Sequence, residues 1–414
     1  MRLLFVCKSL PFTYKGGIQT HVWELTEKLV ACGHEVSILT AGSWLEGHHV
    51  SRIDGREIIY LPYLPGRKIP FLRKTLEDVC FNLAAYSWVK KKDNQFDRIH
   101  IQGRSGCFYA AMHQRGKGTP VVSTFHRLLD VEYEYDGQRT GKIDGFFHRL
   151  FMGLAEHAAA RNSDHSIAVS KEMKKEIEHY IDGDLSPISI LPNGVDRNFG
   201  NSIVDKDRWQ LVFVGRLETI KGVFTLIKAL PLMDERIDLV LIGDGPERKS
   251  LETLVKRLGL RLRVRFMGDQ DAASVQYWIQ RSFALVLPSF HETQGIVLLE
   301  AGVCARPVIA ADAPGINEII EHGYNGLLFP PGEIQSLAIC VNHVFNDPAL
   351  ATRLGKAGRY HAVTHYDWTS IATRTIEVYR KIGDHKAGER INQVLLNEKN
   401  DLPQFSSTTL NTAR

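Results

Sequence analysis

The chain alternates between short apolar runs and longer stretches whose apolar positions have helical spacing. The run RLLFV at residues 2–6 predicts a buried strand. The segment after the following loop places apolar side chains on one helix face, at Ile18, Val22, Leu25 and Leu29. Gly33 ends this helix, and HEVSILT predicts the next strand. A strand, a helix and a strand in this order form a βαβ unit, whose strands are parallel.

The same alternation continues through two halves of the chain. In the first half, strands are predicted at 98–102, 120–125, 165–170 and within 186–196. In the second half, strands are predicted at 211–215, 238–245, 263–268, 283–289 and 306–311. Helices are predicted from about 221 to 230, up to about 258 and from about Gly295. The expected fold class is therefore α/β, with two Rossmann-like, doubly wound domains facing each other across a cleft.

Changes in composition suggest where the domains begin and end. We expect a first domain at 1–196 and a polar linker without periodicity at 197–207. The second domain is expected at 208–366. The helical spacing of Trp368, Ile371, Ile376 and Tyr379 predicts a closing helix. This helix is expected at 367–384 and packs back toward the first domain, and a polar tail, partly disordered, follows at 385–414.

Composition and charge narrow the class of protein. The 414 residues are 44% hydrophobic and 24% charged, with a formal net charge of +4 spread along the chain. This balance argues against a nucleic-acid binder and leaves room for weak attraction to an anionic surface. The six cysteines have no metal-site spacing, and we expect reduced thiols. With no signal peptide or apolar span of about 18 residues, we expect a cytoplasmic protein, soluble or peripheral at the inner face of the membrane.

Three segments place glycine, histidine or cations at predicted strand or helix ends. Gly16 and Gly17 precede the first helix, where backbone N–H groups can approach an anion, although an ordinary turn explains them equally well. His126 follows a strand and would face the ligand crevice of a parallel sheet, unless it is an ordinary loop histidine. Arg216 and Lys221 lie at a strand end and at a helix start, where two cations can hold a diphosphate. Solvated surface charge is the alternative for this pair.

Two glutamates flank the apolar stretch HETQGIVLLEAG. Glu292 is expected in the loop before the helix, and Glu300 about one and a half turns inside it. A rise of about 12 Å over eight helical residues would place the two carboxylates at the two ends of an extended ligand. Two solvated surface glutamates are the alternative. However, GIVLLEAGV is apolar on nearly all sides, and a buried glutamate without a partner is unfavourable.

Asp-x-Asp triplets are the only candidate metal motif. They occur at Asp182/Asp184, Asp205/Asp207 and Asp269/Asp271. Only the last follows a predicted strand, and hard cations usually need more oxygen ligands than one triplet supplies. We therefore expect no metal site and no bound cofactor.

Together the motifs resemble the retaining glycosyltransferases of family four, also called group 1, which have the GT-B fold. The resemblance covers nearly the whole chain, and the order and spacing of its motifs are specific. They are GGIQTHVWELTEKLVACGHEV, LPNGVD, GRLETIKG, LIGDGPE, PSFHETQGIVLLEAGVCARPVIA and NGLLFPPGE. The resemblance implies an enzyme that moves a sugar from a nucleotide-diphosphate sugar to an alcohol acceptor, with retention and without a metal. A role in cell-surface polysaccharide, glycolipid or glycoconjugate synthesis would follow.

The resemblance also implies roles for particular residues. Glu292 would face the donor sugar, and Glu300 would bind the ribose of the nucleotide. Arg216 and Lys221 would bind the diphosphate and stabilise the leaving group. The catalytic set would then be Arg216, Lys221, Glu292 and His126. The donor-binding set would add Gly16, Gly17, Gln294, Gly295, Ile296, Val297 and Glu300.

Gln294 departs from the family pattern, because many members have Phe or a similar residue at this place. An amide there is able to hydrogen-bond a sugar hydroxyl, which leaves the donor sugar open. Two other functions stay open: a GT-B epimerase or phosphorylase, and a catalytically silent scaffold of a glycan-synthesis complex. A dehydrogenase lacks support, because the G-x-G-x-x-G fingerprint is missing.

The acceptor, a sugar, a lipid-linked group or another alcohol, is expected at the first domain. The segment 67–74 mixes basic and apolar residues and suggests contact with an anionic membrane. An ordinary solvated basic loop explains this segment equally well.

Overall fold

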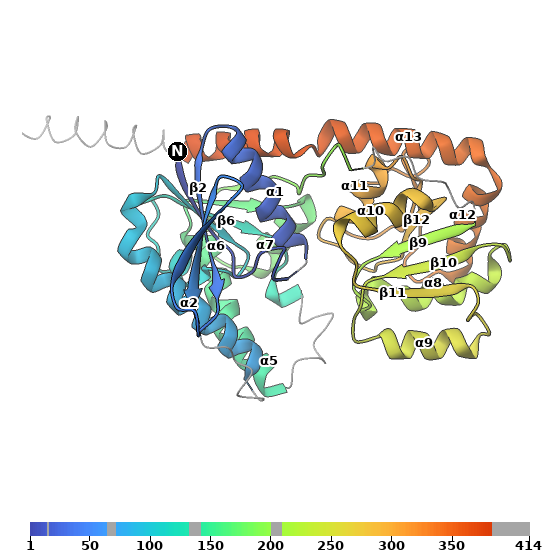
Figure 1. Ribbon diagram of the computed structural model, residues 1–414, viewed down its shortest axis with the longest axis horizontal. Helices are drawn as coiled ribbons and strands as arrows, with labels where there is room; N and C mark the ends of the chain where they lie inside the picture. The colour runs from blue at the N-terminus through green and yellow to red at the C-terminus, as the bar shows by residue number, and fades with distance from the viewer. Residues whose placement is uncertain (15, 64–71, 132–141, 200–208, 383–414) are drawn as a thin grey trace, which may run out of the picture.

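The computed structural model describes residues 1–14, 16–63, 72–131, 142–199 and 209–382. Figure 1 shows two α/β domains side by side, each built on one sheet. Most of the predicted linker, the predicted tail and positions 67–71 of the predicted membrane segment lie outside the described residues. Within the described residues, no helix combines the length and the apolarity that crossing a membrane requires.

The first domain holds an eight-stranded sheet in the order β3-β4-β2-β1-β5-β6-β7-β8. Every pairing is parallel except that of β3 with β4. Phe5 of β1 lies opposite Ile38 on one side and His100 on the other. The strand order reverses between β1 and β5, and ligands of such sheets bind at the carboxyl ends beside this reversal. The strands are β1 Arg2–Val6, β2 Glu35–Gly42, β3 His49–Ile53, β4 Arg56–Pro62, β5 Arg98–Gln102, β6 Val121–Phe125, β7 His165–Ala168 and β8 Ile188–Ile190.

The second domain holds a six-stranded, wholly parallel sheet in the order β11-β10-β9-β12-β13-β14. Val212 of β9 lies opposite Val240 and Leu285. Here the order reverses between β9 and β12. The predicted fold class is confirmed. The strands are β9 Gln210–Val214, β10 Asp238–Ile242, β11 Val264–Gly268, β12 Ala284–Leu287, β13 Val308–Ala311 and β14 Leu327–Phe329.

Helices cover the sheets of both domains, because their apolar faces complete separate cores. Those of the first domain are α1 Gly17–Ala31, α2 Arg73–Lys92, η2 Asp93–Gln95, α3 Cys107–Met112, α5 Lys142–His148, the π-helical η3 Arg149–Gly153, α6 Leu154–Asn162 and α7 Lys171–Tyr180. Those of the second domain are η4 Thr219–Lys221, α8 Val223–Ala229, η5 Leu230–Leu232, α9 Arg248–Arg257, α10 Ala272–Arg281, α11 Ile296–Val303, α12 Ile334–Asn346 and α13 Pro348–His365.

A last helix over 368–382 returns from the second domain to the first. Figure 1 shows it running from α13 back along the first domain. Trp368, Ile371 and Tyr379 join the apolar core that includes Phe5 and Leu25. The Tyr379 hydroxyl lies 2.6 Å from Nδ1 of His100, which ties the helix to β5. The described part of the chain thus ends against the first domain.

Several helices and strands begin or end at other residues than the hydrophobic pattern predicted. The helix expected from about residue 221 starts as the 3₁₀ turn η4, and α8 begins only after Gly222. Gly222 has φ +66°, and a Cβ there would lie 2.0 Å from the Pro288 carbonyl oxygen, so the backbones approach too closely for a continuous helix. The strand expected to reach residue 245 ends at Ile242, because Gly243 has φ +119°. The hairpin β3–β4 was not predicted from the pattern.

Candidate active site

A cavity of about 750 Å³ lies between the two domains. This volume is within the range of small-molecule sites. Many of the residues that line it follow the strands on each side of the two order reversals: β1 and β5 in the first sheet, β9 and β12 in the second. The topology therefore brings together the loop before Gly17, the segment of Arg216 and Lys221, and the loop of Glu292.

Two helix N-termini line the cavity from opposite domains. α1 starts at Gly17 after Gly16, and α11 starts at Ile296 after Gly295, and neither has a side-chain cap. Uncapped N-termini leave backbone N–H groups and partial positive charge for an anion. A Cβ on Gly17 would lie 3.4 Å from Cδ1 of Ile296, so the two helix starts are close neighbours. Gly16 has extended backbone that any residue can adopt.

Lys221 and Glu292 form an ion pair inside the cavity. Lys221 Nζ donates to Glu292 Oε1 at 2.6 Å, and the Ser289 hydroxyl donates to the same oxygen at 2.8 Å. The loops that carry them are joined by a backbone bond from Phe290 N–H to the Ile220 carbonyl at 2.8 Å. The cation and the carboxylate are therefore held together as one ion pair.

Arg216 links the two walls of the cavity. Its Nε lies 3.0 Å from Glu218 Oε1, and its Nη1 donates to the Tyr14 hydroxyl of the first domain at 3.3 Å. The Arg216 side chain is 60% exposed, so the guanidinium can turn toward a ligand. A planar guanidinium suits a phosphate, because two parallel N–H groups bind two of its oxygens.

Gln294 lines the cavity, and its amide is hydrogen-bonded to Asn193. The side-chain oxygen accepts hydrogen bonds from the backbone and side-chain nitrogens of Asn193, each at 2.6 Å. The side-chain nitrogen donates to the Asn193 carbonyl at 3.0 Å. The side-chain nitrogen carries a second N–H, so the expected contact with a sugar hydroxyl stays a prediction. Gln294 also fastens the loop of Glu292 to the first domain, since Asn193 follows β8.

His126 lies directly after β6 in the cavity wall and is buried. Its Nε2 lies 3.0 Å from Oε1 of Gln102, and its ring packs edge-on against His21 at 4.7 Å between centroids. Burial, with the neighbouring His21 and His100 rings, holds the pKa of His126 well below its usual range. The ring is therefore neutral at physiological pH and is suited to hydrogen bonding rather than to charge stabilisation.

Glu300 is the predicted residue that does not line this cavity. It lies in α11, and no hydrogen bond to its carboxyl group is found within the described part of the chain. Burial raises the pKa of Glu300 to about 7. A carboxyl group with no hydrogen bond from the described residues can gain hydrogen bonds from ligand hydroxyls.

Two aspartates of the acidic triplets have local contacts within the protein. The Asp271 side chain caps α10 by accepting from Ser274 N–H at 2.7 Å, and Asp184 pairs with Arg115 at 3.1 Å. Asp205 and Asp207 lie outside the described residues. Among the residues that the structure describes, no group of three or more His, Cys, Asp or Glu side chains is arranged to hold a metal ion.

The sequence reasoning missed several cavity residues: Tyr14, Lys74, Arg104, Arg127 and Asn193. Two of them had a signal, because Arg104 lies in the glycine-flanked loop QGRSG after a predicted strand and Arg127 follows His126. Tyr14 lies in the loop before Gly16 that the pattern had singled out, whereas only the fold brings Lys74 to the cleft.

Two family models match consecutive parts of the chain. The model described as Glycosyltransferase Family 4 matches residues 15–199, and the model described as Glycosyl transferases group 1 matches residues 195–361. The first match includes Gly17 and His126, and the second includes Arg216, Lys221 and both glutamates.

Relatives align along almost the whole chain. A glycogen synthase of Mycobacterium tuberculosis is 29% identical over 409 residues, which cover 94% of this chain and 96% of the relative. A D-inositol 3-phosphate glycosyltransferase of Pseudarthrobacter chlorophenolicus is 26% identical, over 91% of this chain and 93% of the relative.

Solved structures show the same fold. Sucrose-phosphate synthase from Thermosynechococcus elongatus superposes with a TM-score of 0.77 at 23% identity, over 93% of this chain and 99% of that one. Anabaena HepE, solved with UDP-glucose, gives a TM-score of 0.71 at 21% identity, over 92% and 100% of the two chains. The two domains are therefore arranged in the GT-B manner.

Proposed function

We propose that this chain, which belongs to the glycosyltransferases of family 4 and group 1, transfers a sugar from a nucleotide-diphosphate sugar to an alcohol acceptor with retention and without a metal. One observation carries the proposal. Arg216 and Lys221 line the same cavity as two uncapped helix N-termini. This is a site for a diphosphate, because fixed N–H groups and two cations can neutralise it.

The donor would extend from this anion site in both directions. Glu292 lies on the cavity wall and would bind the sugar, whereas Glu300 in α11 would bind the ribose. The HepE structure holds UDP-glucose, which makes UDP-glucose the first donor to test. The leaving diphosphate would gain charge as its bond to the sugar breaks, and Arg216 and Lys221 would stabilise that charge.

We propose a front-face mechanism for the retention. The acceptor oxygen bonds to the anomeric carbon on the face from which the diphosphate leaves, and the acceptor proton passes to a departing phosphate oxygen. A double displacement would need a free carboxylate nucleophile beside the anomeric carbon. Glu292 is instead bound by Lys221 and Ser289. NMR of the first product would show its anomeric configuration, and an inverted configuration would contradict retention.

Three further measurements separate this function from the alternatives. Transfer should require an alcohol acceptor, whereas an epimerase would act on the donor alone and a phosphorylase would need phosphate. Titration calorimetry should show binding of a nucleotide sugar, and its absence would favour a silent scaffold. Activity should survive EDTA, and loss that a divalent cation restores would contradict the metal-free proposal.

The biological product follows from the acceptor. We propose synthesis of a polysaccharide, glycolipid or other glycoconjugate. The two relatives named above differ in their acceptors, glycogen in one name and an inositol phosphate in the other. Family membership therefore leaves the acceptor open. A screen of donors and acceptors that reads nucleoside diphosphate release is the first experiment.

We also propose a peripheral contact with an anionic membrane through residues 67–74 and through exposed apolar side chains of α5 and the segment after it. Asp144 of α5 accepts hydrogen bonds from the backbone nitrogens of Lys74 and Thr75, which fixes α5 beside the start of α2. The stretch from α5 to α6 exposes apolar side chains at Ile143, Phe146, Leu150, Phe151 and Leu154. Figure 1 shows α5 projecting at the end of α2. Exposed apolar side chains beside basic ones are typical of interfacial segments.

Vesicle co-sedimentation tests the contact. The wild-type chain should bind phosphatidylglycerol vesicles more strongly than phosphatidylcholine vesicles. Phe146→Ser combined with Leu154→Ser should reduce this binding. Leu262→Ser is the matched control, because Leu262 is 94% exposed in the second domain. Equal binding by all three proteins would reject the contact.

A further inference from the structure

Helix α7 of the first domain contacts the second domain at two points. Figure 1 shows α7 on the side of the first domain that faces the second. At the start of the helix, the Glu318 carboxylate accepts hydrogen bonds from the backbone nitrogens of Lys171 and Glu172, at 2.8 and 2.7 Å. Further along the helix, Oε1 of Glu176 lies 2.7 Å from Nε2 of His291. Glu318 and His291 belong to the second domain, so both contacts cross the boundary between the domains.

The apolar face of α7 fixes this helix to the first domain. Met173 and Ile177 are fully buried in a core of that domain. Ser170 caps the helix by accepting a hydrogen bond from Met173 N–H at 2.9 Å. Glu176, one residue before Ile177, is buried as well. The packing of the first domain therefore determines where the Glu176 carboxylate lies.

The Glu176 carboxylate is not well explained by the stability of the fold. Its second oxygen, Oε2, is buried and has no hydrogen-bond partner among the described residues. A buried carboxylate with an unsatisfied oxygen is unfavourable, and buried charged pairs contribute little net stability. The contact with His291 is better explained by what it positions.

Both points of contact are next to the backbone of Glu292. His291 directly precedes Glu292 in the chain. The Glu292 N–H donates to the Pro314 carbonyl at 3.1 Å, and a Cβ on Gly315 would collide with the Glu292 carbonyl oxygen. The segment that leads to Glu318 therefore packs directly on Glu292, and α7 contacts this segment as well as His291.

The Glu292 side chain continues the connection into the cavity. Its Oε1 accepts hydrogen bonds from Lys221 Nζ at 2.6 Å and from the Ser289 hydroxyl at 2.8 Å. Three links thus join α7 to the cation of the proposed diphosphate site. Glu176 contacts His291, His291 is bonded to Glu292 along the chain, and Glu292 pairs with Lys221.

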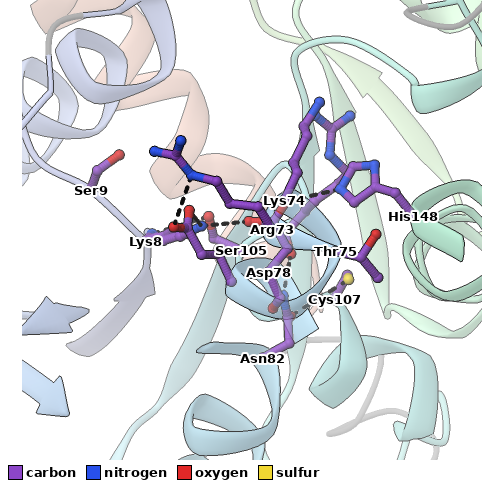
Figure 2. A network of polar contacts seen from close by, with 12 residues as sticks. Lys8, Ser9, Arg73, Lys74, Thr75, Asp78, Asn82, Ser105, Cys107 and His148 are labelled. Carbon is purple, nitrogen blue, oxygen red and sulfur yellow. Dashed lines mark hydrogen bonds and ion pairs between the residues drawn. The ribbon is translucent and has the colours of Figure 1, made fainter. Parts of the chain in front are cut away.

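Other histidine–carboxylate pairs lie within the first domain. His113 Nε2 lies 2.7 Å from Asp164 Oδ2, and both side chains are 6% exposed. Figure 2 shows another such pair, in which Asp78 Oδ2 of α2 lies 2.9 Å from His148 Nε2 of α5. These pairs join elements of one domain, whereas the pair of Glu176 and His291 joins two domains beside the proposed site.

We propose that Glu176 and His291 are positioning residues for sugar transfer. The inference rests on the proposed function, because it takes Glu292 as the residue that faces the donor sugar. Glu176 holds His291, and His291 keeps the adjacent Glu292 where it pairs with Lys221. The described lining of the cavity includes neither Glu176 nor His291, so both act through Glu292. The placement of Glu292 in the second domain therefore depends on a carboxylate of the first domain.

The test compares Glu176→Ala with Glu176→Gln in the full chain, with UDP-glucose or the donor found in the screen. Alanine removes the partner of His291, whereas glutamine keeps an oxygen acceptor at the same reach. His113→Ala is the matched control, because it removes a histidine–carboxylate pair of equal length and similar burial inside the first domain. Steady-state kinetics, titration calorimetry with the nucleoside diphosphate and urea unfolding are measured for each protein.

Glu176→Ala should lower kcat about tenfold, because a small displacement of a group at the reacting centre slows the chemical step strongly. The donor KM and the affinity for the nucleoside diphosphate should stay within about twofold of the wild type, since the binding groups are unchanged. Glu176→Gln should restore most of kcat. His113→Ala should keep the wild-type kcat, whatever stability it loses.

A double variant shows whether Glu176 acts through Glu292. Glu176→Ala combined with Glu292→Gln should be little slower than Glu292→Gln alone, because both changes then affect the same group. His291→Leu breaks the same contact from the second domain and should reproduce the loss of kcat. It replaces Glu176→Ala in these comparisons if that variant does not fold.

Three results would overturn the positioning role. The first is a wild-type kcat for both Glu176→Ala and His291→Leu. The second is an equal loss of kcat in Glu176→Ala and Glu176→Gln, and the third is a double variant in which the two losses multiply in full. A failure of the proposed function looks different, because the wild-type chain would then bind no nucleotide sugar and transfer nothing from it.

Discussion

Asn193 and Gln294 hold each other across the boundary between the two domains. The Gln294 side chain accepts from two nitrogens of Asn193 and donates to its carbonyl, and both residues are buried. Asn193 Oδ1 also lies 2.8 Å from Nδ1 of His21 in α1. The loop that carries Glu292 is thereby tied to the helix that begins at Gly17, so the two halves of the proposed donor site are positioned by one polar contact.

Gln294→Met should therefore destabilise the protein and disturb the site together. The substitution keeps the size of the side chain but leaves buried polar groups of Asn193 without their partner, which costs about 2 to 4 kcal/mol. Urea unfolding should show a lower midpoint, and donor KM should rise. Gln335→Met changes an exposed glutamine of α12 and should shift the midpoint little. If the Gln294→Met variant is as stable as this control, the contact between Asn193 and Gln294 contributes nothing to the stability of the fold.

Lys221→Ala should reduce transfer by about 100-fold or more, because it removes the charge that stabilises the leaving diphosphate. Glu292→Gln should mainly slow transfer and leave the affinity for the nucleoside diphosphate nearly unchanged. Steady-state kinetics measure transfer and titration calorimetry measures the affinity, both on the same proteins. Lys228→Ala is the control, since Lys228 is an exposed lysine of the neighbouring helix α8. Normal turnover by the Lys221→Ala variant would remove Lys221 from the proposed mechanism.

Glu300 should make stability depend on pH. Burial raises its pKa from 4.5 to about 7 in the folded protein, so the folded state favours the protonated form. This contribution is complete below about pH 4.5 and is lost as the pH rises through about 7, where the native state then holds a half-buried charge. Glu300→Gln removes that charge and should raise the melting temperature at pH 8 more than at pH 5.

Thermal unfolding at the two pH values measures this difference. Glu235→Gln is the control, because Glu235 is exposed in the same domain. An equal shift at pH 5 and pH 8 would contradict the raised pKa of Glu300. Glu300→Ala should separately weaken nucleotide binding, and unchanged binding would reject the ribose role proposed for Glu300.

Gly222→Ala should be far more damaging than Gly259→Ala. Both glycines have positive φ, +66° and +70°. A Cβ on residue 222 would lie 2.0 Å from the Pro288 carbonyl oxygen, whereas nothing lies within 4 Å of one on residue 259. Gly259→Ala should cost about 1 kcal/mol from backbone strain alone. Gly222→Ala must also move the backbone next to Lys221, so urea unfolding and transfer should both be impaired. Equal effects of the two substitutions would show that the close approach is not rigid.

The pattern of apolar positions predicted the two α/β halves because each strand and helix has its own period. The ends of the helices and strands were predicted less accurately. Gly222 and Gly243 stop their elements where two backbones meet, and such contacts join segments distant in the chain. The hairpin of β3 and β4 was missed, because β3 alternates weakly and lies at the edge of the sheet.

The sequence by itself determined the local parts of the site: glycines before two helices, cations at the start of the second half and a glutamate on each side of an apolar helix. Local spacing is enough for these, because each depends on the residues next to it. Only the tertiary structure decided which groups meet. It paired Lys221 with Glu292, used the Gln294 amide on Asn193, and gathered Lys74, Arg104 and Arg127 on one wall. These contacts depend on strand order and on the packing of two domains, since hydrogen bonds and charge pairs act over a few ångströms in space, whatever the separation along the chain.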